Sequence, residues 1–133
     1  MIDHVQLVVA DIEASRKFYA GIMSVLGIPP GPSAADYFNY DELWVSTKES
    51  HAAQGELTGR VHLAFATRDR AVVDAFHEAG LAAGGRDGGA PGERTKYHPG
   101  YYAAFVLDPD GNNLEVVYHG EARYSAPSVV ITY

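Results

Sequence analysis

The chain has 133 residues, 47% of them hydrophobic and 20% charged, which is typical of one soluble globular domain. Ten Lys and Arg oppose 17 Asp and Glu, and the formal net charge of -7 disfavours nucleic acid as a partner. No apolar run approaches the roughly 20 residues that span a bilayer, so we expect no membrane insertion. The lack of cysteine excludes disulfides and thiolate ligands. With no signal-peptide pattern at the start, we expect a cytoplasmic location.

An internal repeat appears when the sequence is shifted by 58 residues against itself. Several matches at one constant offset predict two copies of one supersecondary unit. The aligned pairs are His4 with His62, Asp11 with Asp69, Phe18 with Phe76 and Gly27 with Gly85.

The first copy begins with a strand over residues 2–10, in which alternation puts His4 on the face opposite the bulky apolar residues. A helix follows, with Asp11 as its N-cap and stop signals from Gly27 to Pro30. After it, two short strands at 37–40 and 43–46 form a hairpin.

The second copy has the same order. A strand over 61–67 places His62 opposite its bulky residues, and Asp69 caps the following helix. Strands at 101–107 and 113–118 flank an Asp-Pro-Asp-Gly turn, and one further strand is expected before each hairpin. We therefore predict an α+β fold in one domain, with module one at about 1–58 and module two at about 59–120.

Two stretches lie outside this scheme. Residues 86–100 are rich in Gly, Pro and charge, which predicts a long loop that is either a lid or disordered. The C-terminal tail, residues 121–133, ends in a β-prone run at 129–133 that is able to pair with a sheet edge of this chain or another.

These segments resemble the vicinal oxygen chelate superfamily, which includes glyoxalases, bleomycin-resistance proteins and extradiol dioxygenases. The resemblance rests on residues 2–5, 11–19 and 61–65, and above all on the Asp-Pro-Asp-Gly turn with Glu115 four residues after its glycine. It implies that two βαβββ modules form an eight-stranded cup-shaped sheet with the helices on its outer face.

The resemblance also implies a metal site formed by His4, His62 and Glu115. Two imidazoles and one carboxylate suit one divalent ion such as Fe, Mn, Zn or Ni. Three protein ligands leave positions at which a substrate can chelate the ion, which implies a metal-dependent glyoxalase or dioxygenase-type enzyme. Small members commonly dimerise, sometimes by exchanging modules, so the chain is expected to form a homodimer.

The chain departs from familiar members at several positions. Module one offers Trp44 and Ser46 where glyoxalase I has a carboxylate ligand, and Phe105 stands where dioxygenases have a tyrosine. Fosfomycin-resistance thiol transferases share the ligand set but have a threonine at the position of Gln6. Two alternatives therefore remain: such a thiol transferase, or a metal-free dimeric drug-binding protein of the bleomycin-resistance type.

The remaining site predictions concern the substrate, a small oxygenated molecule. His98 lies where an acid-base histidine is expected, and we predict it as the catalytic residue. The substrate-binding candidates are Gln6, Trp44, Tyr97 and Tyr102.

Overall fold

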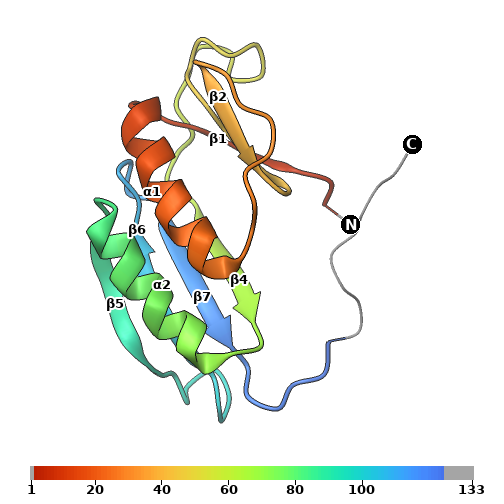
Figure 1. Ribbon diagram of the computed structural model, residues 1–133, viewed down its shortest axis with the longest axis vertical. Helices are drawn as coiled ribbons and strands as arrows, with labels where there is room; N and C mark the ends of the chain where they lie inside the picture. The colour runs from red at the N-terminus through yellow and green to blue at the C-terminus, as the bar shows by residue number, and fades with distance from the viewer. Residues whose placement is uncertain (1, 125–133) are drawn as a thin grey trace.

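The computed structural model describes residues 2–124, and these form two α-helices and seven β-strands (Figure 1). The part of the tail beyond Tyr124, including its β-prone run, lies outside the described residues. Within the described range no helix is long and apolar enough to cross a membrane. The elements are β1 (Val5–Val8), α1 (Ile12–Leu26), β2 (Tyr37–Tyr40), β3 (Leu43–Ser46), β4 (His62–Thr67), α2 (Arg70–Ala82), β5 (Arg86–Glu93), β6 (Tyr102–Leu107) and β7 (Asn113–Tyr118).

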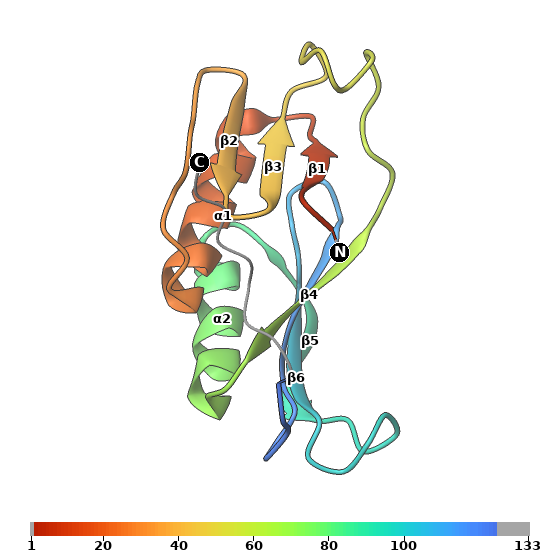
Figure 2. The ribbon, with the colours of Figure 1, turned by 90° about the vertical axis from the view of Figure 1, so that its right-hand side faces the viewer.

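The strands form two sheets, one for each module. The first has the order β1-β3-β2 and the second β4-β7-β6-β5. In both, the first strand of the module lies parallel to the last, and the other neighbours are antiparallel. Figure 2 shows the helices as one layer that covers the same side of both sheets. The predicted α+β class is confirmed. The predicted eight-stranded cup is not confirmed, because the described residues form two sheets of three and four strands.

Module one lacks the further strand that was expected before its hairpin. Pro29, Pro30 and Pro32 occupy that segment, and proline has no backbone N–H to donate to a strand ladder. Only an isolated bridge between Ser33 and Phe38 marks the place in the described structure.

Module two has that further strand, and it corrects the prediction of a loop at 86–100. β5 occupies residues 86–93 and pairs antiparallel with β6 through two register shifts. Glycines are typical of loops, but those of β5 make room for a side chain of the neighbouring strand. A Cβ at Gly88 would lie 3.3 Å from the Cβ of Phe105, and one at Gly89 only 3.0 Å from Cδ2 of the same ring.

The two helices begin as the sequence predicts. The Asp11 carboxylate accepts hydrogen bonds from the backbone N–H groups of Glu13 and Ala14, both at 3.0 Å, and Asp69 accepts from Ala71 at 2.9 Å. Each cap satisfies donors that have no partner within the helix. Helix α1 ends at Gly27, whose φ of 71° is the left-handed conformation that glycine adopts without strain.

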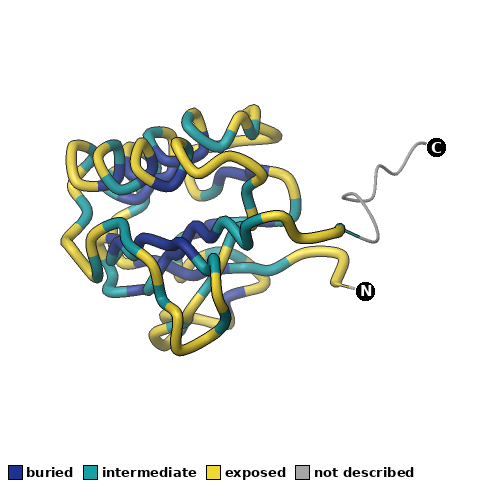
Figure 3. Tube along the Cα trace, turned by 90° about the horizontal axis from the view of Figure 1, so that it is seen from below, coloured by how far each residue is buried: buried dark blue, intermediate teal, exposed yellow. Residues whose placement is uncertain are grey.

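One hydrophobic core joins the modules. Buried side chains from both helices meet buried side chains from both sheets, and Figure 3 shows the buried residues where the helix layer faces the sheet layer. Phe18 and Ile22 of α1 and Phe76 of α2 are fully buried, and Phe18 and Ile22 lie one turn apart on the same face of α1.

The Asp-Pro-Asp-Gly turn between β6 and β7 binds module two to module one. The fully buried Asp108 accepts from the backbone N–H groups of Asp110 and Asn112 and from the Asn112 side chain. It also accepts from the Tyr19 hydroxyl on α1, at 2.9 Å. The pKa of the Tyr19 hydroxyl is raised by burial and then by Asp108, so the phenol remains the donor. The most specific motif of the sequence is thus a structural clasp between the modules.

Candidate functional site

The face of the second sheet that points away from the helices carries the candidate site. In the strand register, Glu115 of β7 lies beside Ala64 of β4 on one side and Phe105 of β6 on the other. Residues at intervals of two share a face, so His62, Phe105 and Glu115 all belong to this open face. Leu63 and Phe65 pack on the core instead, as the alternation predicted.

His62 and Glu115 form the central contact of this face. The Nε2 atom of His62 lies 3.0 Å from Oε2 of Glu115, and its Nδ1 atom lies 3.0 Å from the backbone carbonyl of Asn113. A carbonyl oxygen only accepts, so Nδ1 carries a proton and donates it. When the ring is neutral, Nε2 therefore has no proton and presents its lone pair to the Glu115 carboxylate. Nε2 and Oε2 are then both acceptors, and at 3.0 Å they need a proton or a cation between them.

This donor set fits a divalent metal. Metal-binding histidines commonly donate their other ring N–H to a carbonyl, which fixes the ring and its tautomer. Glu115 is buried, with 3% of its surface exposed, whereas His62 is exposed. The carboxylate is therefore held in place while the imidazole remains reachable from solvent.

Tyr101 holds the other oxygen of the carboxylate. Its hydroxyl donates to Oε1 of Glu115 at 2.5 Å. Burial raises the pKa of the Tyr101 phenol, and the hydrogen bond to Glu115 raises it further, so the phenol stays protonated at neutral pH. Glu115 thus has one oxygen fixed by Tyr101 and the other directed at His62.

Two further histidines lie beside Tyr101. Nδ1 of His98 is 2.8 Å from the Pro99 carbonyl, and its Nε2 is 2.9 Å from Nδ1 of His119. The two imidazoles stack at 5.2 Å, and the Tyr101 ring meets each of them edge-on at 5.2 Å. His98, our predicted catalytic residue, therefore lies against Tyr101, which in turn donates to Glu115.

The predicted residues of module one lie on a separate face. Gln6 pairs with Trp44 in the register of β1 and β3 and donates to the Ser46 hydroxyl at 2.8 Å. His4 precedes β1, is exposed, and has its Nδ1 atom 2.6 Å from Oδ1 of Asp3. Within residues 2–124 no three His, Asp or Glu side chains gather as a metal site, so this chain alone brings together two of the three predicted ligands.

Tyr97 and Tyr102 differ in where they point. Tyr97 is exposed and its ring lies 4.9 Å from that of Tyr101, at the edge of the open face. Tyr102 is on the helix side of the sheet, where its hydroxyl donates to Asp74 at 2.6 Å and Arg70 covers its ring. The structure does not bring Tyr102 to the His62–Glu115 pair.

Sequence reasoning missed Tyr101 and His119 as site residues, although a signal for both was present. Alternation along β6 puts residue 101 on the face of Phe105, and alternation along β7 puts residue 119 on the face of Glu115. Tyr101 already lies in the strand predicted at 101–107, where alternation selects it over Tyr102, and one step beyond the strand predicted at 113–118 selects His119.

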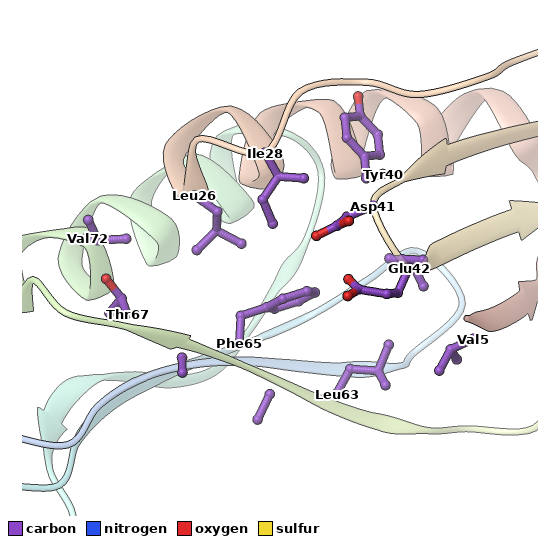
Figure 4. A pocket seen from close by; sticks show the side chains of 13 residues that line it. Val5, Leu26, Ile28, Tyr40, Asp41, Glu42, Leu63, Phe65, Thr67 and Val72 are labelled. Carbon is purple, nitrogen blue, oxygen red and sulfur yellow. The ribbon is translucent and has the colours of Figure 1, made fainter. Parts of the chain in front are cut away.

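A separate cleft of about 510 Å³ lies between the modules (Figure 4). Its walls come from the end of α1, the edge strand β4 and the turn between β2 and β3, and the side chains of Asp41 and Glu42 point into it. Burial raises the pKa of the Glu42 carboxyl, and Asp41 raises it further. No imidazole lines the cleft, so it lacks the donors that suit a transition metal.

The described residues thus form two paired modules, each with its first strand parallel to its last, and the second module carries a His–Glu pair on its open face. The family model described as the Glyoxalase/Bleomycin resistance protein/Dioxygenase superfamily matches residues 1–116. The chain belongs to this superfamily.

Solved structures agree with the assignment. A glyoxalase/bleomycin resistance protein from Albidiferax ferrireducens T118 is 31% identical, with a TM-score of 0.74, over 89% of this chain and 98% of that one. A glyoxalase/bleomycin resistance protein/dioxygenase family enzyme from Burkholderia phytofirmans PsJN is 24% identical, with a TM-score of 0.69, over 89% of this chain and 98% of that one. A lactoylglutathione lyase from Agrobacterium tumefaciens is 20% identical, with a TM-score of 0.62, over 89% of this chain and 92% of that one. The last two support the fold alone. No curated protein matches the chain in sequence.

Proposed function

We propose that the protein is a metal-dependent enzyme acting on a small oxygenated substrate that chelates one divalent ion, Fe, Mn, Zn or Ni. The observation that carries this proposal is the His62 ring, whose Nδ1–H is bound to the Asn113 carbonyl while Nε2 faces Glu115. The bound ion would supply Lewis-acid stabilisation of negative charge on substrate oxygens.

His4 is proposed as the third ligand, contributed by the neighbouring chain of a homodimer. Its own module presents Gln6 and Trp44 on an open face, and the other module presents His62 and Glu115 on another. Joining the two faces from different chains would complete the ligand set and add Gln6 and Trp44 to the substrate cavity.

The chain's own residues then have distinct tasks. Tyr101 fixes the orientation of the Glu115 carboxylate through its hydrogen bond. His98 remains the proposed acid-base residue. Its contact with His119 offers a partner that can exchange a proton with it, and it lies at the same edge of the face as Tyr97.

The test is metal content by elemental analysis on protein purified without chelator or affinity tag. We expect about one divalent ion per chain, lost in His62→Ala and Glu115→Ala and kept in the control His51→Ala, an exposed loop histidine. No ion after reconstitution with Fe, Mn, Zn and Ni would overturn the proposal. Light scattering that gives the mass of one chain at micromolar concentration would overturn the shared site.

A second function, binding of a small apolar cation without metal, is favoured by the cleft between the modules. Leu63 and Phe65 give it apolar walls, and Asp41 and Glu42 give it negative charge. We expect 1-naphthylmethylammonium to bind more tightly than 1-naphthylmethanol, with the difference lost in Glu42→Gln. Because burial raises the pKa of the Glu42 carboxyl above its ordinary value, this carboxylate is protonated at a higher pH than a free one, and the preference should weaken as acidification protonates it. Equal binding of the two probes, or binding that a chelator abolishes, would exclude this function.

A further inference from the structure

Arg94 follows β5 and folds its side chain back across that strand. Its Nη2 atom donates to the carbonyl of Ala90 at 2.7 Å, and its Nη1 atom makes a longer contact of 3.5 Å with the carbonyl of Glu93. Its own backbone N–H donates to the carbonyl of Tyr101 at 2.7 Å. Both the backbone and the guanidinium are thus held in one place beside the open face.

Phe105 connects Arg94 to the candidate metal site. The guanidinium carbon lies 5.7 Å from the centre of the Phe105 ring, and the His62 ring stacks on the same ring at 6.2 Å and 27°. Phe105 also pairs with Glu115 in the register of β6 and β7. A cation, an apolar ring and the His–Glu pair therefore lie in a row on one face.

Glycines in β5 make this arrangement possible. A Cβ at Gly92 would lie 2.8 Å from Nη1 of Arg94, and a Cβ at Gly89 would lie 3.5 Å from Nη2. Because these positions of the strand have no side chains, the Arg94 side chain has room to lie across β5 and against Phe105.

No carboxylate lies within ion-pair distance of Arg94 among residues 2–124, whereas Arg16 pairs with Glu13 and Arg70 with Glu93. A guanidinium has five N–H donors, and the two carbonyls engage only part of them. The remaining donors suit a carboxylate, which arginine binds with two parallel hydrogen bonds.

We propose that Arg94 is an anion subsite that selects substrates with a carboxylate, a flat body resting on Phe105 and two adjacent oxygens at the His62–Glu115 pair. This inference rests on the proposed metal-dependent function and adds the chemical class of its substrate. Arg94 would bind the substrate in its ground state and so determine specificity, while the chelating oxygens remain at the other end of the row.

The test compares catechol with 3,4-dihydroxybenzoate, which adds one carboxylate, by calorimetric titration of protein loaded with Zn(II). We expect 3,4-dihydroxybenzoate to bind at least tenfold more tightly than catechol. Arg94→Gln should remove this ratio and leave catechol binding unchanged, and Arg94→Lys should keep part of it because an ammonium lacks the fork geometry. Lys96→Gln is the matched control, since that cation lies over Tyr97, and it should keep the full ratio.

Equal binding of the two probes to the parent protein, or a ratio that survives in a folded Arg94→Gln, would overturn the subsite. A second titration, of unsubstituted benzoate into metal-free protein, separates this inference from the proposed function. Binding of benzoate that is lost in Arg94→Gln supports the subsite even where no metal is bound. Absence of metal binding counts against the proposed function, and absence of benzoate binding counts against Arg94.

Discussion

The two modules place the same residue types at the same positions and use them differently. Gly27 and Gly85 align in the repeat, yet Gly27 has a left-handed φ of 71° with open space around it, whereas Gly85 is crowded by Val106 and Phe18. His4 and His62 also align, but only His62 has a carboxylate of its own module's last strand beside its ring. A repeat in sequence therefore preserves the topology of a module and leaves the chemistry of each copy free to diverge.

The fourth strand is the second difference. Both modules have a segment between helix and hairpin, but that of module one is proline-rich and that of module two is glycine-rich. Proline removes ladder donors, whereas glycine keeps them and opens space for Phe105 and Arg94. The extra strand of module two thus also supports the face on which the candidate site lies.

The largest effect is expected where the two modules are clasped together. Asp108→Ala removes the acceptor of four hydrogen bonds and leaves the buried Tyr19 hydroxyl without its partner. We expect a loss of about 4 kcal/mol in the free energy of unfolding, measured by urea denaturation. Asp36→Asn, at an exposed carboxylate outside the clasp, is the control and should change the free energy of unfolding by about 0.5 kcal/mol or less. Equal losses in the two variants would show that the clasp is not the link between the modules.

The aligned glycines provide the next test. A Cβ at Gly85 would lie 2.5 Å from Cγ1 of Val106 and 2.6 Å from Cε2 of Phe18, so Gly85→Ala should lower stability by about 3 kcal/mol through overpacking. Gly27→Ala meets no atom within 4 Å and should cost about 1 kcal/mol through its backbone conformation alone. Thermal unfolding of both variants measures the difference, and the reverse order would contradict the assignment of the two causes.

A smaller effect is expected at the carboxylate of module two. Tyr101→Phe removes the donor that orients Glu115 without leaving a large void, so affinity for the metal should fall about tenfold while stability changes little. Competition with a fluorescent chelator measures this affinity. Tyr97→Phe is the control, because the Tyr97 ring is exposed and lies beside Tyr101 rather than on Glu115. Unchanged affinity in Tyr101→Phe would remove the tyrosine from the site.

Local sequence signals predicted much of this molecule. The caps at Asp11 and Asp69, the αL stop at Gly27 and the side of β4 on which His62 lies all depend on residues near one another in the chain. Phe105 gave a misleading signal. It stands where a tyrosine was expected, whereas the hydroxyl that donates to Glu115 belongs to Tyr101, which lies just before the same strand.

The remaining features depend on contacts that no short segment encodes. The local sequence of β5 predicts a loop. The segment forms a strand because it pairs with β6, whose Phe105 side chain fills the space next to Gly88 and Gly89. His98 and His119 are 21 residues apart, and only the pairing of β6 with β7 brings them to 2.9 Å. The position of His4 relative to His62 depends on how modules associate, which a repeat in one chain does not specify.

The smallest effect concerns the strand that only module two has. Asp87 of β5 accepts from Nε2 of His77 on α2 at 2.9 Å and from the backbone N–H of Gly89. The hydrogen bond from His77 lowers the pKa of the Asp87 carboxyl below its ordinary 3.8. A lowered pKa in the folded state stabilises the protein above pH 3.8, and this contribution is lost as the pH falls through the lowered value.

Asp87→Asn should therefore lower the melting temperature slightly at pH 7, and the gap to the parent protein should close as the pH is brought below 3.8. Thermal unfolding by circular dichroism across this range measures the gap. In the background of His77→Ala the gap at pH 7 should shrink, because the principal donor to the carboxylate is gone. A gap that is independent of pH would mean that the charge of Asp87 contributes nothing to stability, and that its contact with His77 does not help to hold β5 against α2.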